Sequence, residues 1–137
     1  MAYVKHTVTV GLIKGNCLYM SQRINTANFE GRWQFAGGKL ENGEHPIDGA
    51  LREVEEETSL KIKPDRLKYE DVIFDDPTCD VCFAYLIELN ENETPIRVET
   101  NKMSDWILMT GDEALKLNLM PGLKSIIKQL QIRFDGL

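Results

Sequence analysis

The segment from residue 37 to residue 60, GGKLENGEHPIDGALREVEEETSL, constrains the fold more than any other, because it leads from a glycine pair into one amphipathic helix. Pro46 suits the first turn of a helix. Apolar side chains then recur at spacings of three, four and seven residues, which predicts one buried face. The residues of this face are Ile47, Ala50, Leu51, Val54 and Thr58. The rest of the chain must therefore provide a core on which this face packs.

Acidic side chains crowd one side of the same helix. At about 100° per residue, Glu53, Glu56 and Glu57 share one stripe beside the buried face, whereas Asp48 and Glu55 point elsewhere. Like charges three or four residues apart repel each other by roughly 0.2–0.5 kcal/mol per pair. The stripe is therefore either a solvated acidic face or a site for a cation that offsets the repulsion.

The glycine pair Gly37-Gly38 precedes the acidic helix and is predicted to form a tight turn. Glycine lets the backbone approach a ligand closely, so a carbonyl of this turn could lie beside the acidic stripe. Oxygen ligands of this kind suit Mg²⁺ or Mn²⁺ rather than zinc. The combination favours a cation site over a solvated face.

Patterns on both sides of the helix predict strands. Residues 3–13 alternate between apolar and polar side chains, and residues 17–22 follow as the return strand of a hairpin. The further expected strands are 32–35, 67–74, 79–89, 94–99 and 105–109, and the further expected helices are 111–117 and 121–132. Strands on both sides of a long helix predict an α/β fold, with a mixed sheet covered by helices.

The length of 137 residues fits a single domain spanning residues 1–137. With 42% hydrophobic and 28% charged residues, the composition is typical of a soluble globular protein. No apolar run is long enough to cross a bilayer, and the first residues alternate instead of forming a signal-peptide core. We therefore expect a cytoplasmic protein with no membrane partner, while the sequence carries no signal for the oligomeric state.

The net charge of -6 argues against binding of DNA or RNA, which requires clustered Lys and Arg. An anionic ligand would then need a divalent cation. The three cysteines are too few for a secreted disulfide framework and fit a reducing compartment. Cys79 and Cys82 form a CxxC inside a predicted strand, where residues three apart point to opposite faces. We expect both to be packing residues.

Together, these residues resemble the Nudix box, G-x5-E-x7-REUxEExGU, in which U is apolar. Gly38, Glu44 and the run REVEEETSL at 52–60 occupy its positions, and only Ser59 departs from it, where the box has glycine. A serine in the left-handed cap at this position would cost about 1 kcal/mol. The resemblance to MutT-like Nudix hydrolases extends over nearly the whole chain and implies an α/β/α sandwich with a mixed sheet flanked by helices.

The resemblance also implies the composition of a metal centre. The implied ligands of Mg²⁺, with Mn²⁺ as an alternative, are the carboxylates of Glu53, Glu56 and Glu57 and a backbone carbonyl of Gly37 or Gly38. Arg52 is implied to pair with a carboxylate of the box, and Glu44 to act behind the ligands. This set would make the acidic stripe the catalytic centre.

Further roles follow from the same resemblance. Lys39 would steady a phosphate, and Glu99, in the loop before the tryptophan-containing strand, would be the general base. The implied substrate-binding residues are Arg23, Phe35, Phe74, Asn118 and Leu123. Phe35 and Phe74 would pack against the nucleobase. Leu123 stands where MutT has an asparagine that reads oxidised guanine, and Asn118 lies close by, so recognition of 8-oxo-dGTP is in question.

The reaction implied is attack of water on a phosphorus atom of a nucleoside diphosphate derivative. The leading hypothesis is hydrolysis of a (deoxy)nucleoside triphosphate to the monophosphate and pyrophosphate, with a small nucleotide as the partner. An alternative substrate class is ADP-ribose, a nucleotide sugar or a dinucleotide polyphosphate. A second alternative is a nucleotide-binding module without catalysis, although such a scaffold typically loses one of the acids that are all present here.

Overall fold

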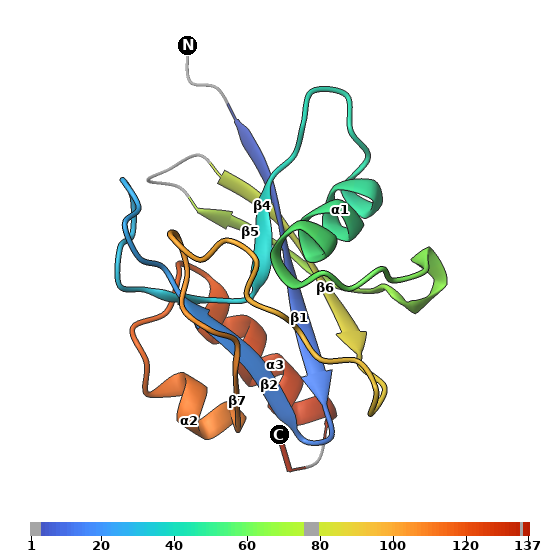
Figure 1. The fold of residues 1–137 in the computed structure, drawn as a ribbon, viewed down its shortest axis with the longest axis vertical. Helices are drawn as coiled ribbons and strands as arrows, with labels where there is room; N and C mark the ends of the chain where they lie inside the picture. The colour runs from blue at the N-terminus through green and yellow to red at the C-terminus, as the bar shows by residue number, and fades with distance from the viewer. Residues whose placement is uncertain (1–3, 76–79, 135) are drawn as a thin grey trace.

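The computed structural model describes residues 4–75, 80–134 and 136–137, and Figure 1 shows how their helices and strands are arranged. The strands are β1 (Lys5–Lys14), β2 (Cys17–Gln22), β3 (Trp33–Gln34), β4 (Ala36–Lys39), β5 (Lys68–Asp75), β6 (Asp80–Glu88) and β7 (Ile107–Met109). The helices are α1 (Pro46–Thr58), α2 (Gly111–Leu115) and α3 (Leu123–Arg133), with a short 3-10 helix η1 (Pro64–Arg66).

The described strands form one seven-stranded sheet in the order β3-β2-β1-β6-β5, with β4 paired to β1 and β7 paired to β2. β1 and β6 run parallel, whereas the other pairs are antiparallel. On the edge opposite β6, β1 pairs first with β4 over residues 7–10 and then with β2 over residues 13–14. β1 is thus the central strand from which the rest of the mixed sheet is built.

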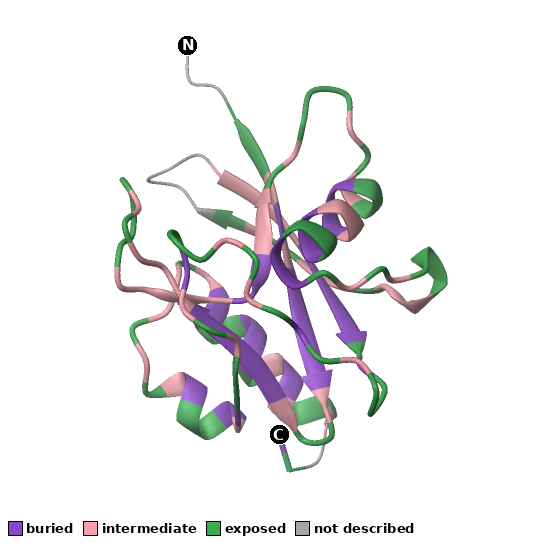
Figure 2. Cartoon of the chain, viewed as in Figure 1, coloured by how far each residue is buried: buried purple, intermediate pink, exposed green. Residues whose placement is uncertain are grey.

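Helices cover both faces of this sheet, and each face has its own hydrophobic cluster (Figure 2). Under α1, Ala50 and Val54 pack with Val10 of β1. Under α3, Ile126 packs with Ile13 of β1, which lies three residues after Val10 and therefore points to the opposite face. The predicted α/β/α arrangement with a mixed sheet is confirmed.

Helix α1 begins at the predicted proline and is capped by the preceding residue. The backbone N–H of Ile47 donates a hydrogen bond to Nδ1 of His45, with a distance of 3.1 Å. Along the predicted apolar face the middle and the end of the helix are buried, but Ile47 is exposed and Leu51 is only half-buried. The predicted face is therefore fully buried only at Ala50, Val54 and Thr58, while the start of the face, in the first turn of the helix, stays open to solvent.

The strand predicted at residues 94–99 is wrong. These residues run without strand pairing through the described segment between β6 and β7. Pro95 has no backbone N–H to donate to a ladder, and the N–H of Ile96 bonds to the carbonyl of Thr58 at the end of α1 (3.0 Å). Ile96 and Val98 remain exposed, so the apolar residues of this segment are not paired with a buried sheet face.

The turn predicted at the glycine pair is also wrong, because both glycines lie in strand β4. Gly37 pairs with Thr9, and Gly38 pairs with Val8. A Cβ atom on Gly37 would lie 2.1 Å from the carbonyl oxygen of Val8. Glycine is therefore required here for the close approach of two strands, which the sequence alone does not distinguish from a turn.

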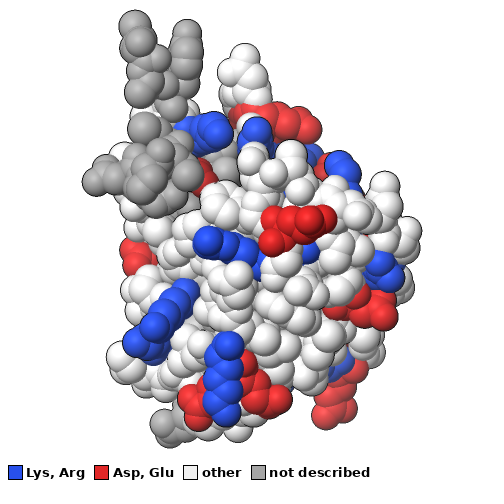
Figure 3. Space-filling view, turned by 90° about the vertical axis from the view of Figure 1, so that its left-hand side faces the viewer, with Lys and Arg blue, Asp and Glu red and all other residues white. Residues whose placement is uncertain are grey.

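Cys82 is half-buried in β6, and burial raises the pKa of its thiol to about 11. Cys79 lies outside the described residues. No helix in the described part of the chain is long and apolar enough to span a membrane. On the face shown in Figure 3, basic and acidic side chains are interspersed.

Replacing Ser59 by glycine is expected to stabilise the protein by about 0.5–1 kcal/mol, because Ser59 ends α1 with φ of +66°, a left-handed conformation that favours glycine. The measurement is the free energy of unfolding in urea. Ser59→Ala is the control, since alanine keeps the unfavourable φ and should not stabilise. Equal effects of the two substitutions would contradict the prediction.

Candidate active site

Helix α1, strand β4 and the segment between β6 and β7 line one cavity of about 450 Å³. Its acidic residues are Glu53, Glu56, Glu57 and Glu99. Its basic residues are Arg23, Lys39 and Lys102. The structure therefore brings together half of the predicted site residues, including Gly37, from four separate parts of the chain.

The two glycines of β4 hold the acidic residues of α1 against the sheet. The backbone N–H of Gly37 donates a hydrogen bond to Oε1 of Glu57, with a distance of 2.7 Å. A Cβ atom on Gly38 would lie only 2.6 Å from Oε1 of Glu53. The absence of a side chain at Gly38 thus makes room for the Glu53 carboxylate, and Gly37 supplies the donor that orients Glu57.

Arg52 connects the acidic residues on the solvent side of α1. Its guanidinium donates two hydrogen bonds of 2.8 Å to the Glu44 carboxylate. It donates a further bond of 3.0 Å to Glu53, and it lies 3.3 Å from Oε2 of Glu56. Arg52 also donates to the carbonyl of Lys39 at the end of β4 (3.1 Å). One cation therefore ties the helix, the preceding loop and the strand together.

Glu44 lies behind the cavity, in the loop that leads into α1, and does not line it. The hydrogen bonds from Arg52, together with one from the backbone N–H of Glu41, lower the pKa of Glu44 to about 2. Glu44 is therefore a fixed negative charge that orients Arg52. Its pair with Arg52 also raises the pKa of the guanidinium.

The two most buried acids of the cavity hold their protons more tightly than an exposed glutamate. Burial, and then repulsion by Glu53, Glu99 and Glu56, raises the pKa of Glu57 to about 8, despite the bond from Gly37. Burial also raises the pKa of Glu53, although Arg52 opposes the change. A carboxylate that is buried beside other acids is stabilised most strongly by a cation.

The acids fit a hard divalent cation by their chemistry rather than by their present spacing. All candidate ligands are oxygen atoms, and they converge on one cavity. Within the described residues, however, no group of three or more His, Cys, Asp or Glu side chains has the spacing of a metal site. Arg52 accounts for part of this spacing, because it bonds to Glu53 and pairs with Glu56 in place of a cation.

Four of the predicted substrate-binding residues do not line this cavity. Phe35 and Leu123 are 2% and 3% exposed and belong to the core under α3, so neither presents a free face to a ligand. Phe74 is 55% exposed but lies on β5, at the far edge of the sheet from β2 and β3. Asn118 is exposed, and its carbonyl accepts a bond from the N–H of Trp33 (2.8 Å). The predicted base pocket is therefore not formed by these residues.

The wall of the cavity away from α1 is polar. It consists of Gln34 and the loop residues 25–28, which the prediction missed. The loop closes on itself through backbone bonds from Arg23 to Arg32 and from Gly31 to Arg23, of 2.9 and 2.8 Å. The guanidinium of Arg23 donates to Oε1 of Gln34 (3.1 Å) and to the carbonyl of Asn28. The mostly polar composition of residues 23–28, RINTAN, is the feature of the sequence from which this wall could have been predicted.

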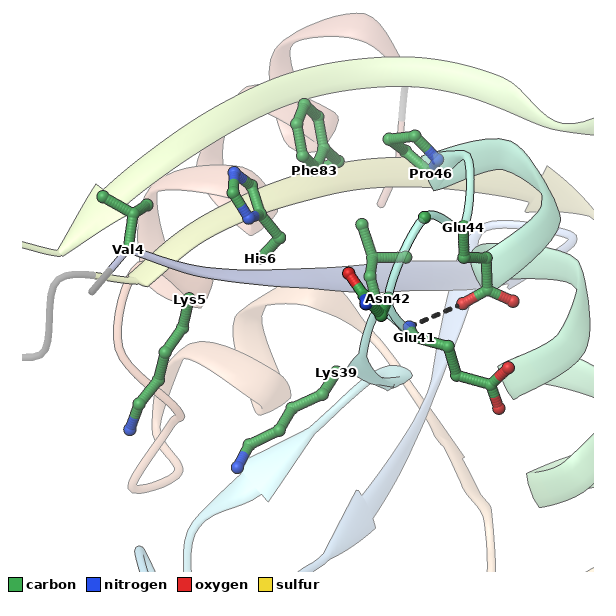
Figure 4. Close-up of a pocket in the computed structure, with 11 residues that line it drawn as sticks. Val4, Lys5, His6, Lys39, Glu41, Asn42, Glu44, Pro46 and Phe83 are labelled. Atoms are coloured by element: carbon green, nitrogen blue, oxygen red, sulfur yellow. Dashed lines mark hydrogen bonds between the residues drawn. The ribbon is translucent and has the colours of Figure 1, made fainter.

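A second cavity, of about 530 Å³, is lined by the start of β1, the loop that follows β4, and Phe83 (Figure 4). The rings of His6 and Phe83 lie nearly parallel in its wall, with centroids 6.4 Å apart. Lys39 borders both cavities. Glu53, Glu56 and Glu57 do not line the second cavity, so the acidic stripe belongs to the first alone.

Replacing Gly38 by alanine is expected to weaken binding of a divalent cation about tenfold or more, because the new methyl group must displace the Glu53 carboxylate. Mn²⁺ titration followed by electron paramagnetic resonance measures this affinity. Gly37→Ala is the contrasting variant, because its methyl group meets the Val8 backbone and should lower the melting temperature instead. Unchanged Mn²⁺ affinity in a folded Gly38→Ala variant would contradict the assigned geometry.

Affinity for the cation is expected to rise with pH. A carboxylate must lose its proton to bind a metal, and the pKa of Glu57 is raised to about 8. The affinity for Mn²⁺ should therefore increase about tenfold per unit between pH 6 and 7 and level off above pH 8. The same titration of Glu57→Gln should show a flatter profile, and a flat profile in the unchanged protein would contradict the role of Glu57.

Comparison with known proteins identifies the family of the chain. A family model described as NUDIX domain matches residues 5–130. The chain is 30% identical over 99 residues to an 8-oxo-dGTP diphosphatase of Proteus vulgaris, which covers 66% of this chain and 88% of that protein. It is also 30% identical over 113 residues to an 8-oxo-dGTP diphosphatase of Escherichia coli (strain K12), with 78% and 83% covered.

The fold agrees with the same family. A crystal structure of a MutT NUDIX hydrolase from Burkholderia pseudomallei matches with a TM-score of 0.79 and 20% sequence identity, over 94% of this chain and 99% of that chain. The match of the family model spans β1 to α3, including every residue of the box. The chain therefore belongs to the Nudix family, as a MutT-like member and a nucleotide pyrophosphohydrolase.

Proposed function

We propose that this enzyme hydrolyses a (deoxy)nucleoside triphosphate to the monophosphate and pyrophosphate, with Mg²⁺ as its cation. One observation carries the proposal, namely that the three box acids and Glu99 share a cavity with Arg23, Lys39 and Lys102. A polyanion bound with a cation requires both kinds of charge. Relatives that are named 8-oxo-dGTP diphosphatase support a nucleoside triphosphate as the substrate class.

Glu53, Glu56 and Glu57 are the proposed ligands of the cation, with a backbone carbonyl of β4 as a further oxygen ligand. Glu57 is already oriented by Gly37, whereas Glu56 is half-exposed and has room to turn toward the cavity. When bound, Mg²⁺ supplies neutralisation of phosphate oxygens and a lower pKa for an attacking water. The role of the three acids is to hold that charge beside the phosphates.

Glu99 is the proposed general base. It lines the same cavity and is close enough to raise the pKa of both Glu53 and Glu57. A base in this position accepts a proton from the water that attacks phosphorus. Its place outside the helix leaves the box acids free for the cation.

The basic residues of the cavity are proposed to bind the substrate. Lys39 ends β4 directly after the two glycines and lines the cavity, so it is a proposed phosphate ligand. Arg23 lies on the opposite, polar wall with Gln34 and Asn28. This wall offers donors and acceptors to a base or sugar. Asn118 and Leu123, the residues implied to recognise oxidised guanine, do not line the cavity. A nucleotide with oxidised guanine is therefore only one of the substrates to be tested.

The deciding experiment is an assay of NTPs, dNTPs, 8-oxo-dGTP, ADP-ribose, nucleotide sugars and dinucleotide polyphosphates with Mg²⁺, in which pyrophosphate and monophosphate are measured. We expect the highest kcat/KM with a nucleoside triphosphate. Glu57→Gln should lower kcat/KM about 100-fold or more, because a charge beside the reacting phosphate is lost.

Glu55→Gln is the matched control for this experiment. Glu55 lies in the same turn of α1, faces Lys61 and does not line the cavity. It should leave kcat/KM within about twofold, as exposed substitutions usually have small effects. Nucleotide binding without turnover of any member of the panel would favour the binding-module alternative. Full activity of Glu57→Gln would contradict the assigned centre.

A further inference from the structure

The segment from Arg97 to Asp105 has a defined shape although it contains no helix or strand. Its tightest part is a turn in which the backbone N–H groups of Lys102 and Met103 both donate to the carbonyl of Glu99, at 3.1 and 3.2 Å. The carbonyls of residues 99–105 all accept a hydrogen bond. A loop with this many backbone bonds is held in one conformation.

One side of this turn is held by a single side chain. The guanidinium of Arg97 donates through Nε to the carbonyl of Met103 (2.7 Å) and through a terminal nitrogen to the carbonyl of Thr100. Its other terminal nitrogen lies 4.0 Å from the carboxylate of Asp105. Arg97 thus bridges the two ends of the turn from outside the cavity, since it does not line it.

The other side of the turn is held by the segment that follows β2 and contains Arg23. The backbone N–H of Ile24 donates to the carbonyl of Lys102 (2.9 Å), and the side-chain amide of Asn25 donates to the carbonyl of Asn101 (3.2 Å). The turn is therefore fixed between Arg97 and residues 24–25. Loss of the Arg97 bonds would leave it attached on one side only.

The turn presents two opposite charges to the cavity. Both Glu99 and Lys102 line it. Glu99 acts on Glu53 and Glu57 through its charge, while Lys102 forms no ion pair with any described residue. An ammonium group beside four acids, but paired with none of them, is available to a phosphate.

We propose that Arg97 is a positioning residue, which holds the 99–103 turn so that Glu99 faces the attacking water and Lys102 binds a phosphate of the substrate. The kinetic part of this inference rests on the proposed hydrolysis of a nucleotide. The structural part does not, because it concerns only the conformation of the turn. Arg97 does not line the cavity and acts through the two residues that it positions.

The kinetic test is a double-mutant cycle between Arg97→Met and Glu99→Gln with the best substrate of the panel. Arg97→Met alone is expected to lower kcat about 100-fold, because the base is displaced. In the Glu99→Gln background it should lower kcat no more than about threefold further, since the base through which it acts is already lost. Lys102→Met should raise KM with little change in kcat. Independent, multiplicative effects on kcat would overturn the inference.

Arg66→Met is the matched control for Arg97→Met. Arg66 is 28% exposed against 30% for Arg97, and it likewise bonds a backbone carbonyl, that of Glu88, while neither residue lines the cavity. It should leave kcat unchanged at a temperature where circular dichroism shows all variants folded. Arg97→Lys, which keeps the charge but loses the planar donor pair, should recover only part of kcat.

Amide hydrogen exchange separates this inference from the proposed function. In Arg97→Met, the amides of Lys102 and Met103 should exchange at least about tenfold faster than in the unchanged protein, while the amides of β1 keep their rates. Unchanged exchange of these two amides would overturn the inference whether or not the chain hydrolyses nucleotides. Faster exchange in a chain that turns over no nucleotide would refute the proposed function and support the positional role of Arg97.

Discussion

The close approach of α1 to β4 is the contact on which the site depends. Helix α1 can bury its apolar face on the sheet only if the neighbouring carboxylates of Glu53 and Glu57 find space at the sheet surface. Strand β4 provides this space with two glycines, which have no side chain. The N–H of Gly37 satisfies one carboxylate oxygen of Glu57, and the space at Gly38 admits the carboxylate of Glu53. The same contact therefore completes the core and creates a cluster of buried acids.

The distribution of charge follows from this arrangement. Arg52 is exposed enough to pair with Glu44 and to reach Glu53 and Glu56, but it makes no bond to Glu57. Glu57 keeps a raised pKa, because its burial is offset only by a backbone N–H. The burial that raises the pKa of Glu57 destabilises its charged form in the folded protein, but it also strengthens the attraction of this carboxylate for a cation. Such a conflict between stability and binding is common at functional sites.

Sequence reasoning predicted the parts of the fold that depend on periodicity. The helix over residues 46–58, the central strands and the grouping of three acids all followed from spacing. Long-range geometry was less accessible. The glycine pair was predicted to be a turn but lies in a strand paired with β1. A single sequence does not distinguish a glycine required for close approach of two strands from a glycine in a turn. Phe35 was predicted to pack against the nucleobase but lies in the core. An aromatic residue in a short predicted strand does not indicate which face of the sheet its side chain takes.

The wall formed by residues 25–28 has a consequence for how such an enzyme changes over evolution. The loop that carries it begins and ends at backbone bonds between Arg23 and its neighbours Gly31 and Arg32, and so it is closed before it reaches the sheet. Insertions or exchanges at residues 26–28 leave the register of β2 and β3 intact and spare the bonds from Ile24 and Asn25 to the 99–103 turn. New substrate preferences can therefore arise in this loop while the machinery of hydrolysis is inherited unchanged.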